Sequence, residues 1–482
     1  MNERRAFCEA AAQLLGPKGF TEDSERVSPW LTDWRGRYTG KAVGLASPAN
    51  TSEVAEFVKL CGRYDVPIVP QGGNSGMSGG ATPDESGDAV VLSLRRMDRI
   101  TSLDTESMQV TCEAGVILQH LHDAAGEHRL RFPLTLGGKG SATIGGLIST
   151  NAGGTQVLRH GTMRAQVLGI EAVLADGSVL DTLTPLKKDN RGFDFKQLLI
   201  GSEGTLGIVT GATLRLLPEV SGRTVIWTGL SSIRQARQLL VHCERFATDA
   251  LEGFEVLPHH CLAAVLDHLP DARAPLAETH QWHALIELVS TKPEGEDLSD
   301  RAQAMLEGAL EADLLDDAVI AANETQAEAF WLLRDSISPA ERAIGPAMQH
   351  DISVPVERMP EFVTAAIPAV ESRFAETRAL AFGHLGDGNV HFHVLAPPDV
   401  TRGVWEESEG KQISHFVHDL VNEWGGSISA EHGIGQMKRE ELGRLGDPTA
   451  LSILRSVKQA LDPRGLLNPG KLLPLAQSGT NP

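Results

Sequence analysis

Several features that would place the chain in a special class are missing from its sequence. The five cysteines form no CxxC pair; they are Cys8, Cys61, Cys112, Cys243 and Cys261. This spacing excludes a disulfide-stapled small domain and favours reduced, mostly buried thiols. No apolar run approaches the length of a membrane-spanning helix.

Positive charge is also scarce. The formal net charge of -20 argues against a nucleic-acid-binding surface, and an anionic substrate would need local cations. At the N-terminus, Glu3 and Glu9 flank a short Ala-rich segment, which is typical of an amphipathic helix and not of a signal peptide. We therefore expect a cytoplasmic protein with no nucleic-acid partner and no membrane span.

The length of 482 residues exceeds the size at which a single core stops growing. We expect an α+β protein with a first domain over residues 1–220, a second α+β domain over residues 221–425, and a C-terminal segment, residues 426–482, that packs back on the first domain. Glycine is abundant, with 49 residues clustered mainly in loops. Such clustering suggests close approach of the backbone to a ligand.

Three glycine-rich regions lie in the first domain. Residues 42–70 predict a strand, a helix and a strand, and the glycine-rich stretch 70–80 follows directly. A strand that leads into a glycine loop is suited to hold an anion with backbone N–H groups. Two more such regions span residues 132–154 and 201–209, with a hairpin predicted between them over residues 167–180. A single glycine loop is more often a turn, but three together favour a cofactor site.

A Rossmann dinucleotide site is disfavoured, because no clean GxGxxG motif follows a strand. Farther along, helices are expected over residues 232–245, 300–314 and 448–461, and a strand over residues 284–289. A further helix starting near Thr325 would place Arg334 and Ser338 on one face, four residues apart, and Pro339 would kink or end it.

A candidate metal site lies in the second half of the chain. A Gly-Asp-Gly-Asn turn separates His384 from His391, and Glu431 and His432 follow forty residues later. Two imidazoles and one carboxylate leave coordination positions open, as a catalytic divalent cation needs. Zinc fits these ligands, with manganese and iron as alternatives. A lone histidine is usually a packed or surface residue, but His393 also lies near this turn and shares a strand face with His391.

Six ordered motifs carry a family resemblance: Pro-Gln-Gly-Gly-Asn-Ser-Gly at 70–76, Gly-Ser-Ala-Thr-Ile-Gly-Gly at 140–146, Gly-Ser-Glu-Gly-Thr-Leu-Gly at 201–207, Gly-His-Leu-Gly-Asp-Gly-Asn at 383–389, Ala-Glu-His-Gly-Ile-Gly at 430–435 and Asn-Pro-Gly-Lys at 468–471. On these motifs the chain resembles the FAD-dependent D-2-hydroxy-acid dehydrogenases, such as D-2-hydroxyglutarate and D-lactate dehydrogenases, within the vanillyl-alcohol-oxidase-like flavoproteins. The resemblance covers about residues 42–471.

The resemblance implies a two-lobed FAD-binding domain and an α+β substrate-binding cap domain. FAD is expected to be non-covalent, because some relatives attach it through a histidine in the first loop, which here reads Gln71-Gly72-Gly73-Asn74. The cofactor-binding positions that it implies are Gly72, Gly73, Asn74, Ser75, Gly76, Ser78, Pro133, Gly137, Ser141, Thr143, Gly145, Gly146, Ser149, Asn151, Gly153, Glu203, Gly207, Ile208 and Asn468.

The same resemblance maps roles onto the second site. His384, His391 and Glu431 would bind the metal, His432 would act as the general base, and hydride would pass to flavin N5. The substrate-binding positions are Arg334, Ser338, Gln349 and His393. At the last two, this chain has glutamine and histidine where the family has lysine and asparagine. The loss of the lysine removes a cation that a dicarboxylate would use.

The expected reaction is oxidation of a small anionic D-2-hydroxy acid, D-2-hydroxyglutarate before D-lactate. A glycolate oxidase subunit of the same fold is a related alternative. From other classes, a zinc hydrolase without flavin and a catalytically silent binding protein stay open. An electron-transfer flavoprotein or a quinone would accept the electrons, and the sequence is compatible with a homodimer.

Overall fold

The computed structural model describes residues 2–186, 188–292 and 298–474. The chain divides into two compact units. The first combines the residues up to Gly154 with residues 160–218 and the residues from Glu431 onward, and the second combines residues 155–159 with residues 219–430. The joints thus lie at 218/219 and 430/431, against the expected 220 and 425. The short segment 155–159 was expected in the first domain but belongs to the second unit.

The first sheet of the first unit has the strand order β1-β2-β4-β3. Its strands are β1 (Phe20–Thr21), β2 (Leu45–Ala46), β3 (Ile68–Gln71) and β4 (Val90–Ser93). Strands β2, β4 and β3 run parallel, and α3 (Thr51–Tyr64) forms the crossover before β3. Asn50 caps α3 by accepting a hydrogen bond from the N–H of Glu53. The strand, helix and strand predicted over residues 42–70 are therefore confirmed.

The second sheet of this unit is antiparallel, with the order β5-β6-β10-β8-β9. Its strands are β5 (Ile100–Asp104), β6 (Gln109–Glu113), β8 (Val167–Val173), β9 (Val179–Asp181) and β10 (Ile208–Arg215). The pairing of β8 with β9 confirms the predicted hairpin, and Gly177 adopts the positive φ of 80° that its turn requires. A small third sheet pairs β7 (Leu130–Arg131) with β11 (Leu217–Pro218).

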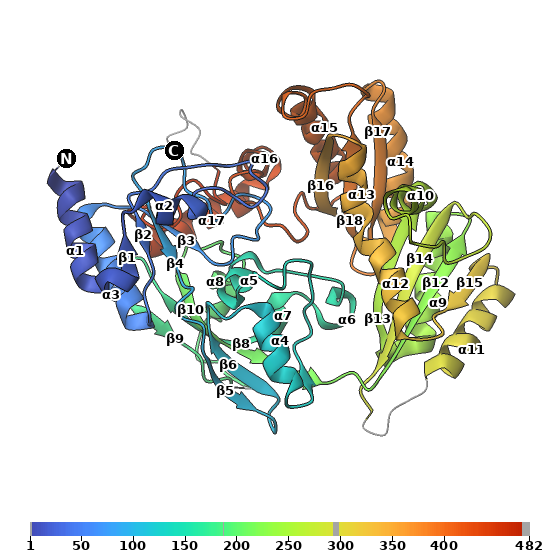
Figure 1. The fold of residues 1–482 in the computed structure, drawn as a ribbon, viewed down its shortest axis with the longest axis horizontal. Helices are drawn as coiled ribbons and strands as arrows, with labels where there is room; N and C mark the ends of the chain where they lie inside the picture. Colours follow the sequence, from blue (N-terminus) through green and yellow to red (C-terminus); the bar gives the residue numbers. More distant parts are fainter. Residues whose placement is uncertain (1, 187, 293–297, 475–482) are drawn as a thin grey trace. The chain divides into compact units, whose positions relative to one another are not determined.

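Helices pack against these sheets, with α1 beside β1 and β2 (Figure 1). Those of the first unit are α1 (Asn2–Gly19), α2 (Ser24–Val27), α4 (Leu118–Gly126), α5 (Ile144–Thr150), α7 (Met163–Gln166), α8 (Lys196–Leu199), α16 (Arg439–Leu445) and α17 (Pro448–Leu461); α6 (Val157–His160) spans the chain joint at 159/160. No helix in the described ranges combines the length and the apolar character that a bilayer crossing requires.

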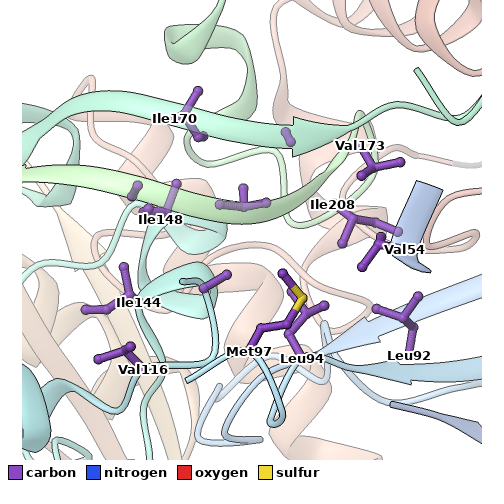
Figure 2. Packing of buried hydrophobic residues seen from close by; sticks show 14 of the residues in the cluster. Val54, Leu92, Leu94, Met97, Val116, Ile144, Ile148, Ile170, Val173 and Ile208 are labelled. Atoms are coloured by element: carbon purple, nitrogen blue, oxygen red, sulfur yellow. The ribbon is translucent and has the colours of Figure 1, made fainter. Parts of the chain in front are cut away.

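One hydrophobic core joins the two main sheets of the first unit. Figure 2 shows Leu92 of β4, Ile148 of α5 and Ile170 of β8 in the same cluster. The loops that follow β3 and precede α5 and β10 are therefore anchored to one rigid core. The five cysteines are buried and unpaired, as expected.

The C-terminal segment extends the first sheet at its β3 edge. The N–H of Ile68 donates to the carbonyl of Leu466, and the N–H of Asn468 donates back to the carbonyl of Ile68, each over 2.8 Å. Leu467 forms a parallel bridge with Ile68 between them. Helix α17, which has the bounds that the sequence predicted, leads into this bridge beside the blue N-terminal strands (Figure 1).

The second unit has one antiparallel sheet of seven strands in the order β15-β12-β14-β13-β17-β18-β16. The strands are β12 (Gly222–Leu230), β13 (Leu251–Pro258), β14 (Trp282–Ser290), β15 (Asp317–Ile320), β16 (Ala347–Ser353), β17 (Arg378–His384) and β18 (Asn389–Leu395). The helices are α9 (Ile233–Ala247), α10 (His259–His268), α11 (Leu298–Glu311), α12 (Glu324–Asp335), α13 (Ile337–Ile344), α14 (Met359–Arg373) and α15 (Lys411–Glu423).

Separate hydrophobic clusters cover the two faces of this sheet. One contains residues of α9, α11, α14 and α15. The other contains residues of α10, α12 and α13 together with Leu257 of β13, Phe382 of β17 and Leu395 of β18. Because side chains alternate along a strand, Glu255, His384 and His393 belong to this second face. Acidic and histidine side chains therefore lie next to apolar ones on this face of the sheet.

The single helix predicted through Arg334 and Ser338 is wrong. Helix α12 ends at Asp335, Ser336 caps it, and α13 begins at Ile337. Pro339 lies in the first turn of α13, where its missing N–H costs no helical hydrogen bond. In a continuous helix its ring would clash with the carbonyl of Asp335, the residue at which α12 ends, so the expectation that Pro339 kinks or ends the helix is confirmed. Arg334 and Ser338 consequently lie on different helices. The strand β14 and the helices α9 and α11 lie where the sequence predicted them, within a few residues.

Candidate active site

The first unit contains a cavity of about 140 Å³ that is open to solvent. The three glycine-rich regions contribute to its wall. Thirteen of the predicted cofactor positions line it: Gly72, Gly73, Asn74, Ser75, Gly76, Ser78, Thr143, Gly145, Gly146, Ser149, Glu203, Gly207 and Ile208. The fold thus brings together loops that are far apart in the sequence.

The glycines of the first loop allow either close packing between loops or exposure of backbone to the cavity. A Cβ on Gly73 would lie 1.7 Å from the carbonyl oxygen of Ser141, and one on Gly72 would lie 2.3 Å from Oγ1 of Thr143. These two glycines let the first loop pack directly on the second. A Cβ on Gly76 would meet no atom within 4 Å. Gly76 therefore leaves backbone exposed to the cavity, where a ligand could approach it closely.

Four predicted cofactor residues adopt a left-handed backbone without being glycine. The φ angles are 51° for Asn74, 51° for Asn151, 52° for Glu203 and 44° for Asn468. Such conformations are uncommon for non-glycine residues, and they gather at functional sites when the surroundings hold them in place. The Asn74 side chain, for example, donates to the carbonyl of Thr32 over 2.8 Å.

Six predicted positions do not line the cavity: Pro133, Gly137, Ser141, Asn151, Gly153 and Asn468. Some of them shape its wall. Asn151 accepts the N–H of Arg164 through Oδ1 over 2.9 Å. Asn468 donates through Nδ2 to the carbonyls of Gly80 and Glu203. Their direct contact with a cofactor stays a prediction.

The sequence analysis also missed residues of the wall. They are Pro70, Gln71, Gly80, Ala81, Leu94, Ala114, Ala142, Leu147, Thr150, Gly204 and Val209. Gln71 is buried, and its side chain donates to the carbonyls of Trp30 and Ala81 over 3.0 and 2.8 Å. Its place inside the first motif could have indicated it. The other residues are mostly apolar or backbone contributors, for which the sequence has no chemical marker.

His432, the predicted general base, lines the same cavity. The Oγ of Ser78 lies within hydrogen-bonding distance of the carbonyls of His432 and Gly433, at 3.2 and 3.0 Å. The structure therefore places an imidazole-bearing loop at the wall that the glycine regions form. It does so within one compact unit.

In the second unit, a hairpin brings the predicted histidines together. His384 ends β17, and His391 and His393 lie on β18. The ring centroids of His384 and His391 are 5.5 Å apart, and those of His391 and His393 are 6.4 Å apart. Gly388 makes the turn possible with a φ of 79° and a backbone approach to Val354 that leaves no room for a Cβ. The imidazoles of His384 and His391 are thus close enough together to coordinate one metal ion.

Glu255 of β13 connects His384 with Arg334. Its Oε1 lies 2.5 Å from Nδ1 of His384, and its Oε2 accepts from Nε and Nη2 of Arg334, each over 2.8 Å. Burial would raise the pKa of Glu255, but the charges of His384 and Arg334 outweigh it and lower this pKa to about 2. The Arg334 guanidinium also lies 5.3 Å from the ring centre of Phe382. Arg334 therefore belongs to a buried network and not to a surface salt bridge.

The remaining substrate positions lie around this network. Nδ1 of His393 is 2.5 Å from Oε2 of the buried Glu341, and Gln349 is paired with His393 in the β16–β18 register. Ser338, in the first turn of α13, is half-buried. Among the described residues, neither the Ser338 hydroxyl nor the Gln349 amide forms a hydrogen bond with the histidines. Glu255 and Glu341 were missed because no local motif marks them.

The donor set suits a divalent cation. A carboxylate on Nδ1 of His384 fixes the ring so that Nε2 carries the ligand lone pair, which is the usual support of a metal-binding histidine. Glu431 directly follows Ala430, whose N–H donates to the carbonyl of Asp351 in β16 over 3.3 Å. The predicted ligand set draws on both units, so the structure of each unit by itself tests only the histidine pair.

Two family models match the chain. The model described as an FAD binding domain matches residues 42–183, and the model described as FAD linked oxidases, C-terminal domain, matches residues 221–472. A D-2-hydroxyglutarate dehydrogenase of Arabidopsis thaliana, named as mitochondrial, is 37% identical over 465 residues, which cover 96% of this chain and 80% of that protein. One of Xanthomonas citri pv. viticola is 35% identical over 450 residues, covering 93% of each.

The chain belongs to the FAD-dependent D-2-hydroxy-acid dehydrogenase family. It is an oxidoreductase that acts on a CH–OH donor. The crystal structure of p-cresol methylhydroxylase with substrate bound matches with a TM-score of 0.75 and 15% identity, over 99% of this chain and 98% of that chain. This likeness confirms the predicted fold of the vanillyl-alcohol-oxidase type. Membership of this family disfavours the hydrolase that would lack a flavin.

Proposed function

We propose that this dehydrogenase oxidises D-2-hydroxyglutarate to the 2-oxo acid, with D-lactate or another small D-2-hydroxy acid as the second candidate. The relatives that carry the first name resemble the chain over 93–96% of its length. The observation that carries the proposal is the presence of His432 on the wall of the cavity that the three glycine regions form. A proton acceptor at the wall of a cofactor cavity is what alcohol oxidation needs.

The cavity fits FAD by its chemistry. The glycine loop at residues 72–76 offers backbone N–H groups for the pyrophosphate, and the second loop packs against it through Gly73. Bound FAD supplies the acceptor for the hydride that leaves the substrate carbon. The first loop contains no histidine, which supports non-covalent binding.

His384, His391 and Glu431 would hold a divalent cation, with zinc favoured by the ligand types. Such a cation supplies Lewis acidity, which lowers the pKa of a bound water from about 15.7 to about 7 and would act similarly on a bound alcohol. Glu255 orients His384 for this task, as the 2.5 Å contact at Nδ1 indicates.

Arg334 is proposed to bind the substrate carboxylate. Glu255 contacts Nε and Nη2 of Arg334 through its Oε2. The Nη1 group of the guanidinium is therefore the one proposed to bind an anionic ligand. Glu255 also keeps the guanidinium in one orientation. His432 would then receive the hydroxyl proton, because an imidazole has a suitable intrinsic pKa near neutrality.

Gln349 and His393 are the two substrate positions at which this chain departs from the family. Gln349 offers an amide where the family's lysine would offer a cation for a second carboxylate, and His393 is bound to Glu341. An electron-transfer flavoprotein or a quinone is proposed as the electron acceptor. A cytoplasmic location and a homodimer stay predictions.

The test is anaerobic mixing of the purified protein with D-2-hydroxyglutarate, its L enantiomer, D-lactate and glycolate. We expect D-2-hydroxyglutarate to bleach the flavin fastest and the L enantiomer to leave it oxidised. If D-lactate or glycolate bleached the flavin faster, that acid would replace D-2-hydroxyglutarate as the assigned substrate. A flavin that no hydroxy acid reduces would contradict the proposed function. Chelation should stop bleaching while FAD stays bound, and a chelator-resistant reaction would refute the metal.

A further inference from the structure

Glu203 is bonded to the loop that carries His432. It is buried and belongs to the cavity wall. Its Oε1 accepts the N–H of Ile434 and its Oε2 accepts the N–H of Gly435, both over 2.7 Å. Both oxygens of the carboxylate are thus directed at the backbone of the residues that follow His432.

The loop at residues 432–437 has a second attachment, to Ser78. The Ser78 hydroxyl reaches the carbonyls of His432 and Gly433, and the Ser78 carbonyl accepts the N–H groups of Gln436 and Met437 over 3.1 and 3.2 Å. Glu203 and Ser78 come from two different glycine-rich regions. Together they hydrogen-bond both the N–H groups and the carbonyl groups of the loop backbone, which fixes the loop in place.

Close packing adds to these hydrogen bonds. A Cβ on Gly433, which has a φ of 75°, would lie 2.9 Å from Oε1 of Glu203. The backbone of Glu203 is itself fixed, because its N–H donates to the carbonyl of Ser149 over 2.8 Å and its carbonyl accepts from Asn468 over 2.7 Å. The carboxylate is therefore a rigid support and not a mobile surface group.

The chemistry of this contact requires an ionised acid. A carboxylate offers only acceptors, which suits two N–H donors. Burial raises the pKa of Glu203 above its usual value, and the N–H groups of Ile434 and Gly435, followed by the charges of Lys438 and Lys471, offset only part of this rise. A glutamine would turn one NH₂ group towards a backbone N–H, so it would lose one hydrogen bond and add a repulsion.

We propose that Glu203 is a positioning residue that holds the His432 loop at the cavity wall, and that its carboxylate does not bind the cofactor. The proposal differs from the cofactor-binding role that the family resemblance implied for Glu203. It rests on the proposed function of His432 as the base.

The central experiment uses Glu203→Gln in the FAD-loaded protein. A shift of a reacting group by about 1 Å can cost on the order of 10²-fold in rate. We therefore expect the limiting rate of flavin reduction by D-2-hydroxyglutarate to fall on the order of 10²-fold. FAD occupancy and the substrate concentration for half-maximal rate should stay unchanged. Hydrogen exchange of the amides at Ile434 and Gly435 should become faster.

Glu171→Gln is the matched control. Oε1 of Glu171 accepts from the hydroxyls of Thr51 and Thr210 in the same unit, and Glu171 does not line the cavity. This variant should keep the rate of reduction and the exchange at Ile434 and Gly435. Gly433→Ala disturbs the contact from the loop side and should reproduce the loss of rate if Glu203→Gln proves unstable.

Two results would overturn the inference. One is unchanged exchange at Ile434 and Gly435 in Glu203→Gln, and the other is a loss of bound FAD in parallel with the rate, which would make Glu203 a cofactor ligand. The exchange measurement needs no substrate. If no hydroxy acid reduces the wild-type flavin, the proposed function fails, and the exchange result still decides whether Glu203 holds the loop.

Discussion

The two candidate sites differ in whether backbone features or side chains shape them. Glycines that permit loop contact and residues with positive φ are prominent in the cavity wall of the first unit. Side chains form the site of the second unit: three histidines, Arg334 and two buried glutamates, fixed on a β-sheet and its covering helices.

This difference separates two kinds of sensitivity. A backbone-lined cavity should respond mainly to added volume, because a new Cβ blocks either loop packing or the ligand. A side-chain site should respond mainly to a change of charge, because Glu255 compensates Arg334 in a buried network and supports His384. His432 is an exception in the first unit, because its side chain is the proposed general base and it lies on the cavity wall.

The largest expected effect comes from His432. Replacement by alanine should lower the rate of flavin reduction by about 10²-fold or more, since a positioned general base contributes about 10²–10⁴-fold. The measurement is anaerobic stopped-flow reduction across pH. FAD should stay bound, because the loop backbone is held by Ser78 and Glu203. A wild-type pH–rate profile in this variant would exclude the role of base.

The next effect concerns charge in the second unit. Glu255→Gln should weaken binding of the proposed zinc ion by about 10–100-fold, which is typical when a partner of a metal-binding histidine is lost. Competition with a chromogenic chelator measures the affinity. Glu287→Gln is the control, because Glu287 also lies on this sheet and binds Arg223 and Trp331 without contacting the histidines. Equal losses in both variants would mean that any buried acid on the sheet matters.

Acid should destabilise the second unit through His283. Burial, with His259 and His280 adding to it, lowers the pKa of His283 from 6.5 to about 4. Its neutral ring accepts the indole N–H of Trp227. A lowered folded-state pKa contributes stability above pH 6.5 that is lost as the pH falls towards 4.

The expected loss is about 2 kcal/mol between pH 6.5 and about pH 5, since one pKa unit corresponds to about 1.36 kcal/mol. Urea unfolding of the full chain measures it. In His283→Gln, whose amide oxygen can still accept from Trp227, this part of the pH dependence should disappear. The same slope in the variant and the wild type would show that other groups, such as His260, dominate.

The smallest effect compares two open glycines. A Cβ on Gly76 or on Gly137 meets no atom within 4 Å, but only Gly76 lines the cavity. Alanine at either site should change the free energy of unfolding of the apoprotein by no more than about 0.5 kcal/mol. Only Gly76→Ala should weaken FAD binding, measured by flavin fluorescence. Weaker binding by Gly137→Ala would establish Gly137 as a cofactor residue.

The sequence predicted local structure well where local interactions determine it. Helix α17 has the predicted bounds because Asp447 caps its start and the prolines that follow limit its end. The continuous helix through Arg334 and Ser338 is absent because α12 ends at Asp335, whose carbonyl would clash with the Pro339 ring in an unbroken helix. Pro339 indicated this break, but the sequence did not fix on which side of Ser338 it would fall.

The candidate sites show the same limit. The glycine-rich regions indicated the loops of the cavity wall, because exposed backbone leaves a mark in composition, and the family resemblance indicated thirteen of its residues. Glu255 and Glu341 escaped notice, because each meets its histidine only after strands or helices distant in sequence come together. The same holds for the contact between Glu203 and Gly435, which are separated by more than 230 positions.

The bridge between Ile68 and Leu467 has a consequence for biosynthesis. An edge strand near the start of the chain obtains its neighbour from a segment near the end, after the whole second unit. On the ribosome, the second unit emerges complete before the first can close. A nascent chain must therefore keep an unfinished flavin domain soluble until residues 466–468 have emerged, and that interval is when misfolding or chaperone capture would compete with assembly.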